Sequence, residues 1–402
     1  MIIKKSTINN VIQLMLLCLI FSASAIRMYN NYVVQSDTIN ISIKHGLIFL
    51  SLMFLVFNNI KLFKPLLFEI FMVVVVLINY LIFSDNRPYI QATFNDYWIY
   101  ILVLFLCAYN ADYKTIEKSM IISAYIILIF DILLFLSPNY YRLFVEYGYG
   151  GIGAVFSYSL LFPAVVFLYL FKKYRFKLCI VPSLIAAFLI VFYGSNRMAI
   201  LSYLLYFCYV IFFNGEKSEK KTVIKSFYFI LLGMILILNL SNIFSFVGTL
   251  IGKDGYNSRI IEQFFKGSLS ANSARLDIIQ QLFSKMFSFG GLLGFGINGD
   301  RVITSTHEYS HNIFLELLIE FGWLIGIIAI ILLLTLAYKT IKKKTCFNNI
   351  IGILFFINLL ALMVSGTFWN SLYFWMFIAI CIRVLFKGEE CYYVDDDEIM
   401  IE

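Results

Sequence analysis

Apolar residues fall in blocks of roughly 15 to 25 along the chain, and short polar stretches separate them. A helix needs about 20 apolar residues to cross the hydrocarbon core of a bilayer, and an isolated strand or open loop cannot cross it. The pattern therefore predicts an all-α polytopic membrane protein with about 12 transmembrane helices. We place the spans near 11–26, 39–57, 66–83, 97–108, 119–136, 152–171, 178–194, 199–213, 223–240, 312–337, 350–365 and 368–386.

Two of these assignments leave an alternative open. Residues 97–108 form a short run for a span, and residues 178–213 fit one long bent helix as well as two helices. We find no repeat of fixed period and no low-complexity linker. The whole chain, 1–402, is therefore expected to form a single membrane domain.

The composition supports a membrane environment. Hydrophobic residues make up 61% of the chain and charged residues 14%, whereas a soluble domain is near half apolar and a quarter charged. A chain of this composition has too few polar residues to cover its own surface in water, which excludes an ordinary soluble protein.

The distribution of basic residues predicts the orientation. With a cytoplasmic N-terminus, twenty of the 31 lysines and arginines fall in cytoplasmic segments. The short outer segments carry only five, which are Arg27, Lys44, Arg87, Arg142 and Arg197. This bias places both termini in the cytoplasm. The net charge of +7 then reflects membrane insertion, and no nucleic-acid partner is expected.

One segment breaks the pattern of short loops. Residues 241–311 lie outside in this topology, and loops of such length are usually functional. Within them, residues 273–289 alternate apolar and polar positions at helical spacing, which predicts a short amphipathic helix at the membrane surface. Glycines then cluster at 290–299 and predict tight turns.

Two of the three histidines lie at the end of this loop, in the string His307-Glu308-Tyr309-Ser310-His311. Formally this is H-E-x-x-H, which binds zinc when both histidines share a helical face and a third ligand is present. We find no third ligand on this side. Ser310 is expected to be the N-cap of the span 312–337, with His307 in the loop and His311 in the first turn, so no metal is expected.

Polar residues next to or inside the spans are candidate functional residues. Arg197 lies between two apolar runs, where its alternative role is to extend to the outer interface. Glu320 lies about 13 Å into the span after His311 and needs either a wet cavity or an ion pair with a neighbouring helix. Gly322 and Gly326 have the spacing of close helix packing. Trp369 is near a loop, where it could stack on a sugar, although an interfacial belt is the commoner role.

Three stretches resemble the superfamily of bacterial O-antigen ligases and of O-antigen and capsular polysaccharide polymerases. The first is Ser195-Asn196-Arg197-Met198-Ala199-Ile200-Leu201. The second runs from Ser273-Ala274-Arg275-Leu276-Asp277-Ile278 to Leu293-Gly294-Phe295-Gly296. The third is His311-Asn312-Ile313-Phe314-Leu315-Glu316, continuing through Glu320-Phe321-Gly322-Trp323-Leu324-Ile325-Gly326. The resemblance covers about 190–330 and departs from the family at Asn196, which is extra, and at Met198, where glycine is usual.

The resemblance implies a glycosyltransferase that moves glycan from a polyprenyl diphosphate to a sugar hydroxyl, outside the bacterial cytoplasmic membrane and without a metal or cofactor. It implies His311 as the catalytic base. The residues that would bind diphosphate or glycan are Arg197, Arg275, Arg301, Asn312 and Glu320. A role for His311 in only hydrogen-bonding the diphosphate, or in packing, stays open.

The motifs do not distinguish the members of this superfamily. We expect a polymerase, which extends a lipid-linked repeat unit and works beside a flippase and a chain-length regulator. One alternative is a ligase that transfers glycan to lipid A core. A different class, a flippase or transporter of the lipid-linked oligosaccharide, should show inverted halves and charges along a mid-membrane path, whereas here the polar residues gather at one face.

Overall fold

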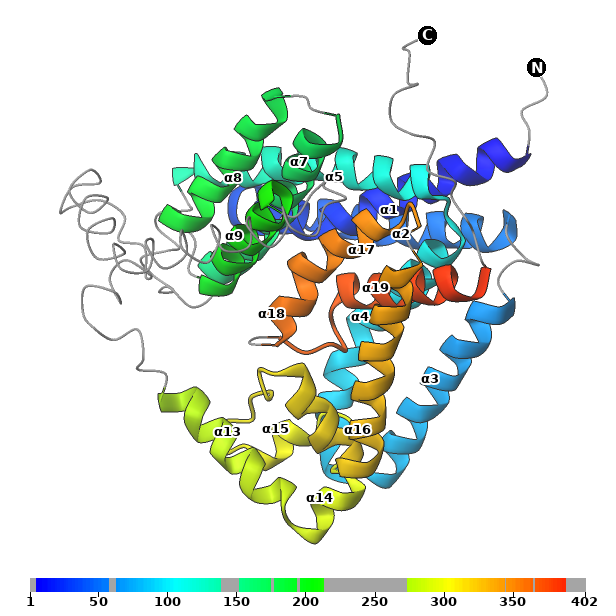
Figure 1. The fold of residues 1–402 in the computed structure, drawn as a ribbon, viewed down its shortest axis with the longest axis vertical. Coiled ribbons are helices and arrows are strands. Elements are labelled where there is room, and N and C mark those ends of the chain that lie inside the picture. The colour runs from blue at the N-terminus through cyan, green and yellow to red at the C-terminus, as the bar shows by residue number, and fades with distance from the viewer. Residues whose placement is uncertain are drawn as a thin grey trace, which may run out of the picture. The chain divides into compact units, whose positions relative to one another are not determined.

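A computed structural model describes residues 5–57, 63–138, 152–174, 177–193, 196–212, 273–343, 345–363 and 366–387, and all regular structure in them is helical. The helices of the first half are α1 (Lys5–Tyr29), α2 (Asp37–Phe57), α3 (Phe63–Ile82), α4 (Arg87–Asn110), α5 (Tyr113–Phe135), α7 (Ile152–Tyr174), α8 (Ile180–Tyr193) and α9 (Arg197–Phe212). Those of the second half are α13 (Ser273–Met286), α14 (Phe289–Leu293), α15 (Gly299–Ile303), α16 (Ile313–Lys342), α17 (Asn348–Leu354), α18 (Leu360–Leu362) and α19 (Leu372–Lys387) (Figure 1).

Most predicted spans fall on helices where the structure describes them, but residues 368–371 precede α19 and are not helical, and residues 223–240 lie outside the described part. In the described part, six helical segments are long and apolar enough to cross a membrane, and one of them, Ile313–Lys342, contains a break at Gly322. The ambiguous run 97–108 belongs to α4, which begins ten residues earlier with Pro88 in its first turn. The described residues within 178–213 include two helices, α8 and α9, each shorter than a full bilayer crossing.

The chain divides into two compact units. The second comprises Phe21–Lys44 and Met120–Asn272. Its centre is α7, which is buried along most of its length and packs against both α8 and α9. The hydroxyl of Ser183 on α8 donates to the carbonyl of Ala164 on α7 at 2.7 Å, so a polar side chain at this buried contact has a partner.

The first unit comprises Met1–Ile20, His45–Ser119 and Ser273–Glu402. Here α4 packs along α19, and α3 packs on α4. Three basic side chains in this unit donate to backbone carbonyls near the ends of α4 and α19. Arg383 donates to the carbonyl of Ala111 and Lys387 to that of Tyr109. Lys343 donates to the carbonyls of Val384 and Leu385. Cations here satisfy carbonyl groups at helix C-termini.

The helix α16 is broken at Gly322, whose φ of 74° and ψ of 172° are not helical. Leu317 and Gly326 are nine positions apart, which would separate them by about 13 Å along a straight helix. Instead, a Cβ added at Gly326 would lie 2.7 Å from the carbonyl oxygen of Leu317. Residues 313–321 therefore fold back against residues 323–342, and the prediction of one continuous span over 312–337 is wrong.

This break also revises two expectations about the glycines. Gly322 is the point of reversal and not a position within a regular helix, because its backbone is not helical. The backbone of Leu292 approaches it so closely that a Cβ would overlap the Leu292 carbonyl oxygen. Gly326 does allow close packing, but against residues 317 and 318 of its own folded-back segment.

A glycine-rich turn closes the broken end of residues 313–321. The N–H groups of Phe295 and Gly296 donate to the carbonyls of Ile319 and Glu320, each at 2.9 Å. Asn86 in turn donates to the carbonyls of Phe295 and Ile297 at 2.7 and 3.0 Å. The last carbonyls of this short helix thus find partners in the turn that precedes it in sequence.

The predicted amphipathic helix at 273–289 exists as α13 and ends at Met286. Its most buried positions, Ile278, Leu282 and Met286, pack against Leu315 and Ile319 of α16. One apolar face of α13 is therefore covered by protein.

Candidate functional site

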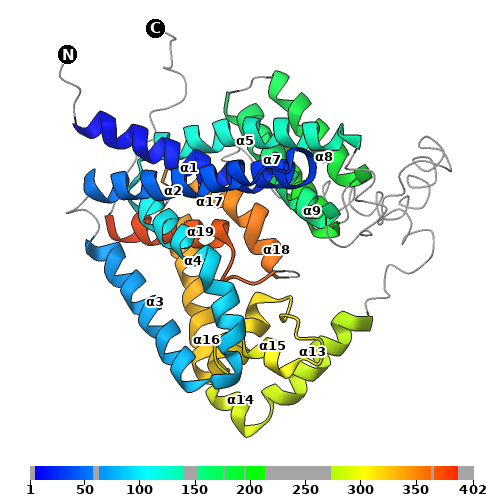
Figure 2. The ribbon, with the colours of Figure 1, turned by 180° about the vertical axis from the view of Figure 1, so that it is seen from behind.

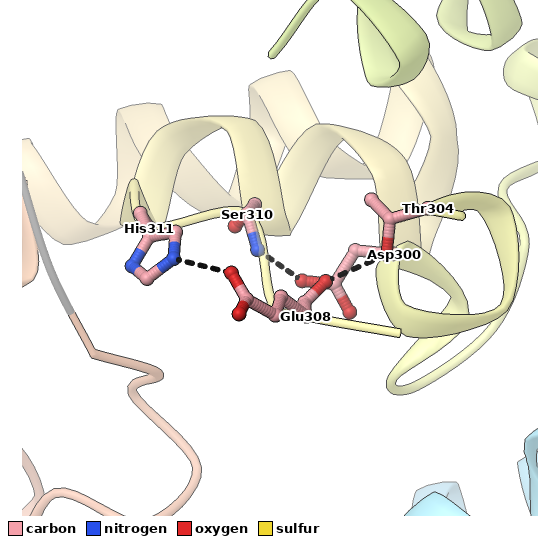
Figure 3. A network of polar contacts seen from close by, with 5 residues as sticks. All are labelled: Asp300, Thr304, Glu308, Ser310 and His311. Atoms are coloured by element: carbon pink, nitrogen blue, oxygen red, sulfur yellow. Dashed lines mark hydrogen bonds and ion pairs between the residues drawn. The ribbon is translucent and has the colours of Figure 1, made fainter. Parts of the chain in front are cut away.

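The polar residues of the first unit gather where the segment 298–312 packs against the short helix 313–321. Asp300 on α15 is 1% exposed. Its two carboxylate oxygens accept hydrogen bonds from the N–H of Arg301 at 2.9 Å and the N–H of Ser310 at 2.7 Å. The aspartate thereby fastens the two ends of the 300–310 loop together, as Figure 3 shows for Ser310.

Burial raises the pKa of Asp300, although the hydrogen bonds from Ser310 and Arg301 and the positive charge of Arg301 oppose the shift. The cause is the loss of solvation of the charged form, which is the usual effect of burying a carboxylate.

Two further carboxylates hold a second loop. Glu320 accepts from the N–H of Asn298 and from the indole N–H of Trp369, both at 2.7 Å. Glu316 accepts from the hydroxyl of Thr367 and, at 3.4 Å, from the N–H of Phe368. The loop 366–371 is thus fixed to the helix 313–321 by neutral donors.

These contacts show how Glu320 is accommodated. Among the described residues its partners are an N–H group and an indole and include no cation. Its position beside the break replaces the predicted depth in a continuous span. Trp369 is 1% exposed and packs with Phe94, Phe368 and Trp375. It therefore presents no face to a sugar.

The start of α16 differs from the prediction. The N-cap is Asn312, whose side-chain oxygen accepts from the N–H groups of Phe314 and Leu315, and whose amide donates to the carbonyl of Met363 at 2.9 Å. The assignment of this role to Ser310 is wrong. His311 accordingly precedes the helix and does not lie in its first turn.

The tyrosine ring of Tyr309 lies beside both Arg301 and His311. The guanidinium carbon of Arg301 is 5.9 Å from the ring centroid, and the imidazole of His311 is 4.2 Å from it, centroid to centroid. The Nε of Arg301 is buried and has no hydrogen-bond partner among the described residues. The site therefore combines Arg301, a permanent cation whose Nε–H is available to donate a hydrogen bond, with His311, whose imidazole can accept a proton.

The histidines of the H-E-x-x-H string lie in non-helical backbone, and both have a left-handed φ of 56°. His307 contacts the carbonyl of Arg301 at 3.1 Å through Nδ1 and stacks on Tyr89, whereas Nε2 of His311 lies 3.6 Å from a carboxylate oxygen of Glu308 (Figure 3). No group of three His, Cys, Asp or Glu side chains in the described part of the chain is arranged to hold a metal.

The structure brings four of the predicted site residues into one segment: Arg301, His311, Asn312 and Glu320. Arg275 lies in the first turn of α13, and Arg197 is the first residue of α9 in the second unit; the side chains of both lie outside the described part, so their roles stay predictions. Sequence reasoning missed Asp300, whose position directly before Arg301 in a glycine-rich stretch was the available signal.

Comparison of the chain with protein-family models, with curated proteins and with solved structures finds no match.

Proposed function

We propose that the chain is a membrane glycosyltransferase of the polysaccharide polymerase type. It would transfer glycan from a polyprenyl diphosphate to the sugar hydroxyl of a lipid-linked repeat unit, on the outer face of the bacterial cytoplasmic membrane. The apolar helices, which suit a lipid bilayer, support the membrane part of this proposal. The resemblance of residues 190–330 to the polymerase and ligase superfamily supports the chemistry.

The observation that carries the proposal is that Arg301 and His311 both lie against the ring of Tyr309. A diphosphate leaving group needs a permanent cation with N–H groups to spare, and Arg301 has a buried Nε without a partner among the described residues. An acceptor hydroxyl needs a base that titrates near neutral pH, which an imidazole supplies.

In the proposed step the acceptor oxygen attacks the anomeric carbon of the donor glycan, and His311 takes the hydroxyl proton. The bond from that carbon to the diphosphate oxygen breaks, and the polyprenyl diphosphate leaves with the electron pair. Arg301 stabilises the charge that develops on the leaving oxygen. The donor lipid carries the activation, so the scheme needs no nucleotide and no cofactor.

The buried carboxylates have a supporting role in this scheme. Asp300 fastens both ends of the loop that carries Tyr309, and Glu316 and Glu320 fix the neighbouring loop. All three are held by hydrogen bonds to neutral groups, although the charge of Arg301 also acts on Asp300. Rigid supporting contacts of this kind keep a catalytic constellation in its productive geometry.

The test is reconstitution of the purified protein in liposomes with fluorescent polyprenyl-diphosphate repeat units. A ladder of lengthened lipid-linked products supports a polymerase, and its loss in the His311→Asn variant assigns it to this site. One transfer to added lipid A core and no ladder would make the protein a ligase. Movement of unchanged lipid across the bilayer, without any product, would reassign it to the transporters.

A further inference from the structure

One end of the first unit exposes a group of large apolar side chains that no described part of the chain covers. We call it the tip patch. It consists of Phe283, Phe287, Phe289, Leu292, Leu293, Leu324 and Ile325. Phe289 is 83% exposed and Leu293 71%. A continuous exposed apolar surface of this kind marks an interaction site.

The helix α13 has three faces, and only one of them contributes to the patch. Ile278, Leu282 and Met286 pack on α16. Phe283 and Phe287, one turn apart, stack on each other and are exposed. The remaining face carries polar residues such as Gln280 and Ser284, which are also exposed. A helix with one face on protein, one apolar and one polar is suited to the plane of a membrane interface.

The tip patch is fixed to α16. The indole N–H of Trp323 donates to the carbonyl of Met286 at 2.9 Å, and its ring contacts Phe287 edge to face. At the end of α14, Gly294 lies so close to residues 320–322 that a Cβ would overlap their backbone. Figure 1 and Figure 2 both show α13 and α14 at the same end of α16.

The patch is continuous with a face of α16 that has the length of a bilayer crossing. Beyond Leu324 and Ile325, this helix exposes Ile328, Ile331 and Leu332. Residues 323–342 span about 30 Å, which equals the thickness of a hydrocarbon core. Lysines 339 and 342 mark the far end, so Trp323 falls at the opposite boundary, where tryptophan is enriched.

We propose that the tip patch is a membrane-binding surface, with α13 and α14 lying in the interface of the leaflet opposite the lysine-rich end. The occupant is lipid, because the patch extends a face that is already of bilayer length. The apolar side chains of α13 and α14 would lie about 5–10 Å into the boundary between headgroups and acyl chains. Gln280 and Ser284 would face water. This placement does not depend on the proposed enzymatic activity.

The experiment measures depth with a fluorophore attached to single cysteines in a cysteine-free background, reconstituted in phosphatidylcholine vesicles. The labelled positions are Phe287→Cys and Phe289→Cys, with Ser284→Cys as the matched control on the polar face of the same helix. Leu332→Cys is the reference for a position deep in the bilayer. Lipids that carry a nitroxide near the top of the acyl chain, or deep in it, quench the label according to its depth.

We expect the nitroxide near the top of the acyl chain to quench the labels at 287 and 289 at least about twofold more than the label at 284, as interfacial burial on one face of a helix requires. The deep nitroxide should quench 332 most strongly. Equal, weak quenching at 284 and 289 would overturn the proposal. Efficient crosslinking of Phe289→Cys between two copies, without lipid quenching, would instead assign the patch to a second copy of the chain.

A second measurement uses the protein without labels at the patch. Brominated lipids quench tryptophan, and the difference between the unsubstituted protein and a Trp323→Phe variant isolates Trp323. Interfacial placement predicts that shallow bromine quenches this difference signal more than deep bromine does. The absence of quenching at either depth would contradict the placement even if the cysteine variants failed to fold.

Discussion

The indole N–H of Trp369 donates a hydrogen bond to a carboxylate oxygen of Glu320 at 2.7 Å, across 49 positions of sequence. Both side chains are buried, at 1% and 2% exposure. The contact joins the loop before α19 to the broken helix, so it couples two segments that border the candidate site. A buried carboxylate that loses such a donor is left incompletely satisfied, which costs more than the bond itself contributes.

We expect Trp369→Phe to lower the free energy of unfolding by about 1–3 kcal/mol more than Trp375→Phe does, because both changes shrink a buried aromatic side chain but only the first removes a hydrogen-bond donor from a buried carboxylate. The measurement is thermal or denaturant unfolding in detergent. Trp375→Phe is the matched control, since Trp375 is also buried but its indole N–H has no partner among the described residues. Equal losses of unfolding free energy in the two variants would show that the hydrogen bond to Glu320 does not contribute to stability.

Gly322→Ala should prevent the reversal within α16. The glycine has a φ of 74° and a ψ of 172°, a conformation essentially restricted to glycine and costing other residues about 1–3 kcal/mol, and the added Cβ would also overlap the Leu292 carbonyl. We expect a large fall in folded protein, measured by monodisperse yield after extraction.

The control for this change is Gly352→Ala in α17, where a Cβ meets no atom within 4 Å. Removing a helical glycine there should be neutral or stabilising by about 0.5–1 kcal/mol. If Gly322→Ala is recovered as well as Gly352→Ala, the break in α16 is not required for folding.

The positions of most helices could be predicted from the sequence, whereas the geometry of the site could not. Span positions follow from apolar blocks, which leave a strong local signal. The break at Gly322 has no such signal, because glycine is also common inside membrane helices and its φ depends on the packing of residues 292–294 against it. The N-cap was misassigned because Ser310 and Asn312 are both capping residues, and only the φ of 56° at His311 between them excludes an earlier start.

The other features of the site that could not be predicted depend on contacts between residues far apart in sequence. The donors that surround Glu316 and Glu320 lie at 298 and 367–369, and no periodicity relates these positions. Arg301, His311, Asn312 and Glu320 could be placed near one another because they are close in sequence. Asp300 was missed because a lone aspartate in a loop is usually solvated, and its burial depends on the tertiary fold.

Arg301→Lys should reduce transferase activity sharply, although it keeps the charge. A lysine cannot reproduce the planar fork that binds phosphate at two points. Activity is measured as the initial rate of product formation from lipid-linked repeat units. Arg197→Lys and Arg275→Lys, at the other two arginines predicted from the sequence, are measured in the same assay.

Arg87→Lys is the matched control for these arginines. Arg87 also lies over a tyrosine ring, that of Tyr80, but its donors are bound to the carbonyls of Tyr80 and Leu81. We expect it to keep most of the activity. Near-normal polymer length and yield in the three site variants would make those arginines structural.

Chelation should leave the activity unchanged. His307 and His311 lie in non-helical backbone, and Glu308 is 55% exposed, so the H-E-x-x-H string lacks the helical face that a zinc site requires. Glu308→Gln should also be tolerated, within about threefold, because an exposed ion pair contributes about 0–1 kcal/mol. Loss of activity on chelation, restored by zinc, would show that the H-E-x-x-H string binds zinc after all.

His311 is the residue whose replacement should abolish transfer, and His307 provides its internal control. Both have a φ of 56°, so asparagine, which tolerates left-handed backbone, is the replacement that separates chemistry from backbone strain. We expect His311→Asn to lower the rate by about 10²–10⁴-fold, the range for loss of a general base, with normal expression and insertion. His307→Asn should retain substantial activity, because the His307 ring contacts the carbonyl of Arg301 and the ring of Tyr89 and not Tyr309. Similar rates for the two variants, or a mere shift in chain length for His311→Asn, would show that the base lies elsewhere and that His311 only orders the loop.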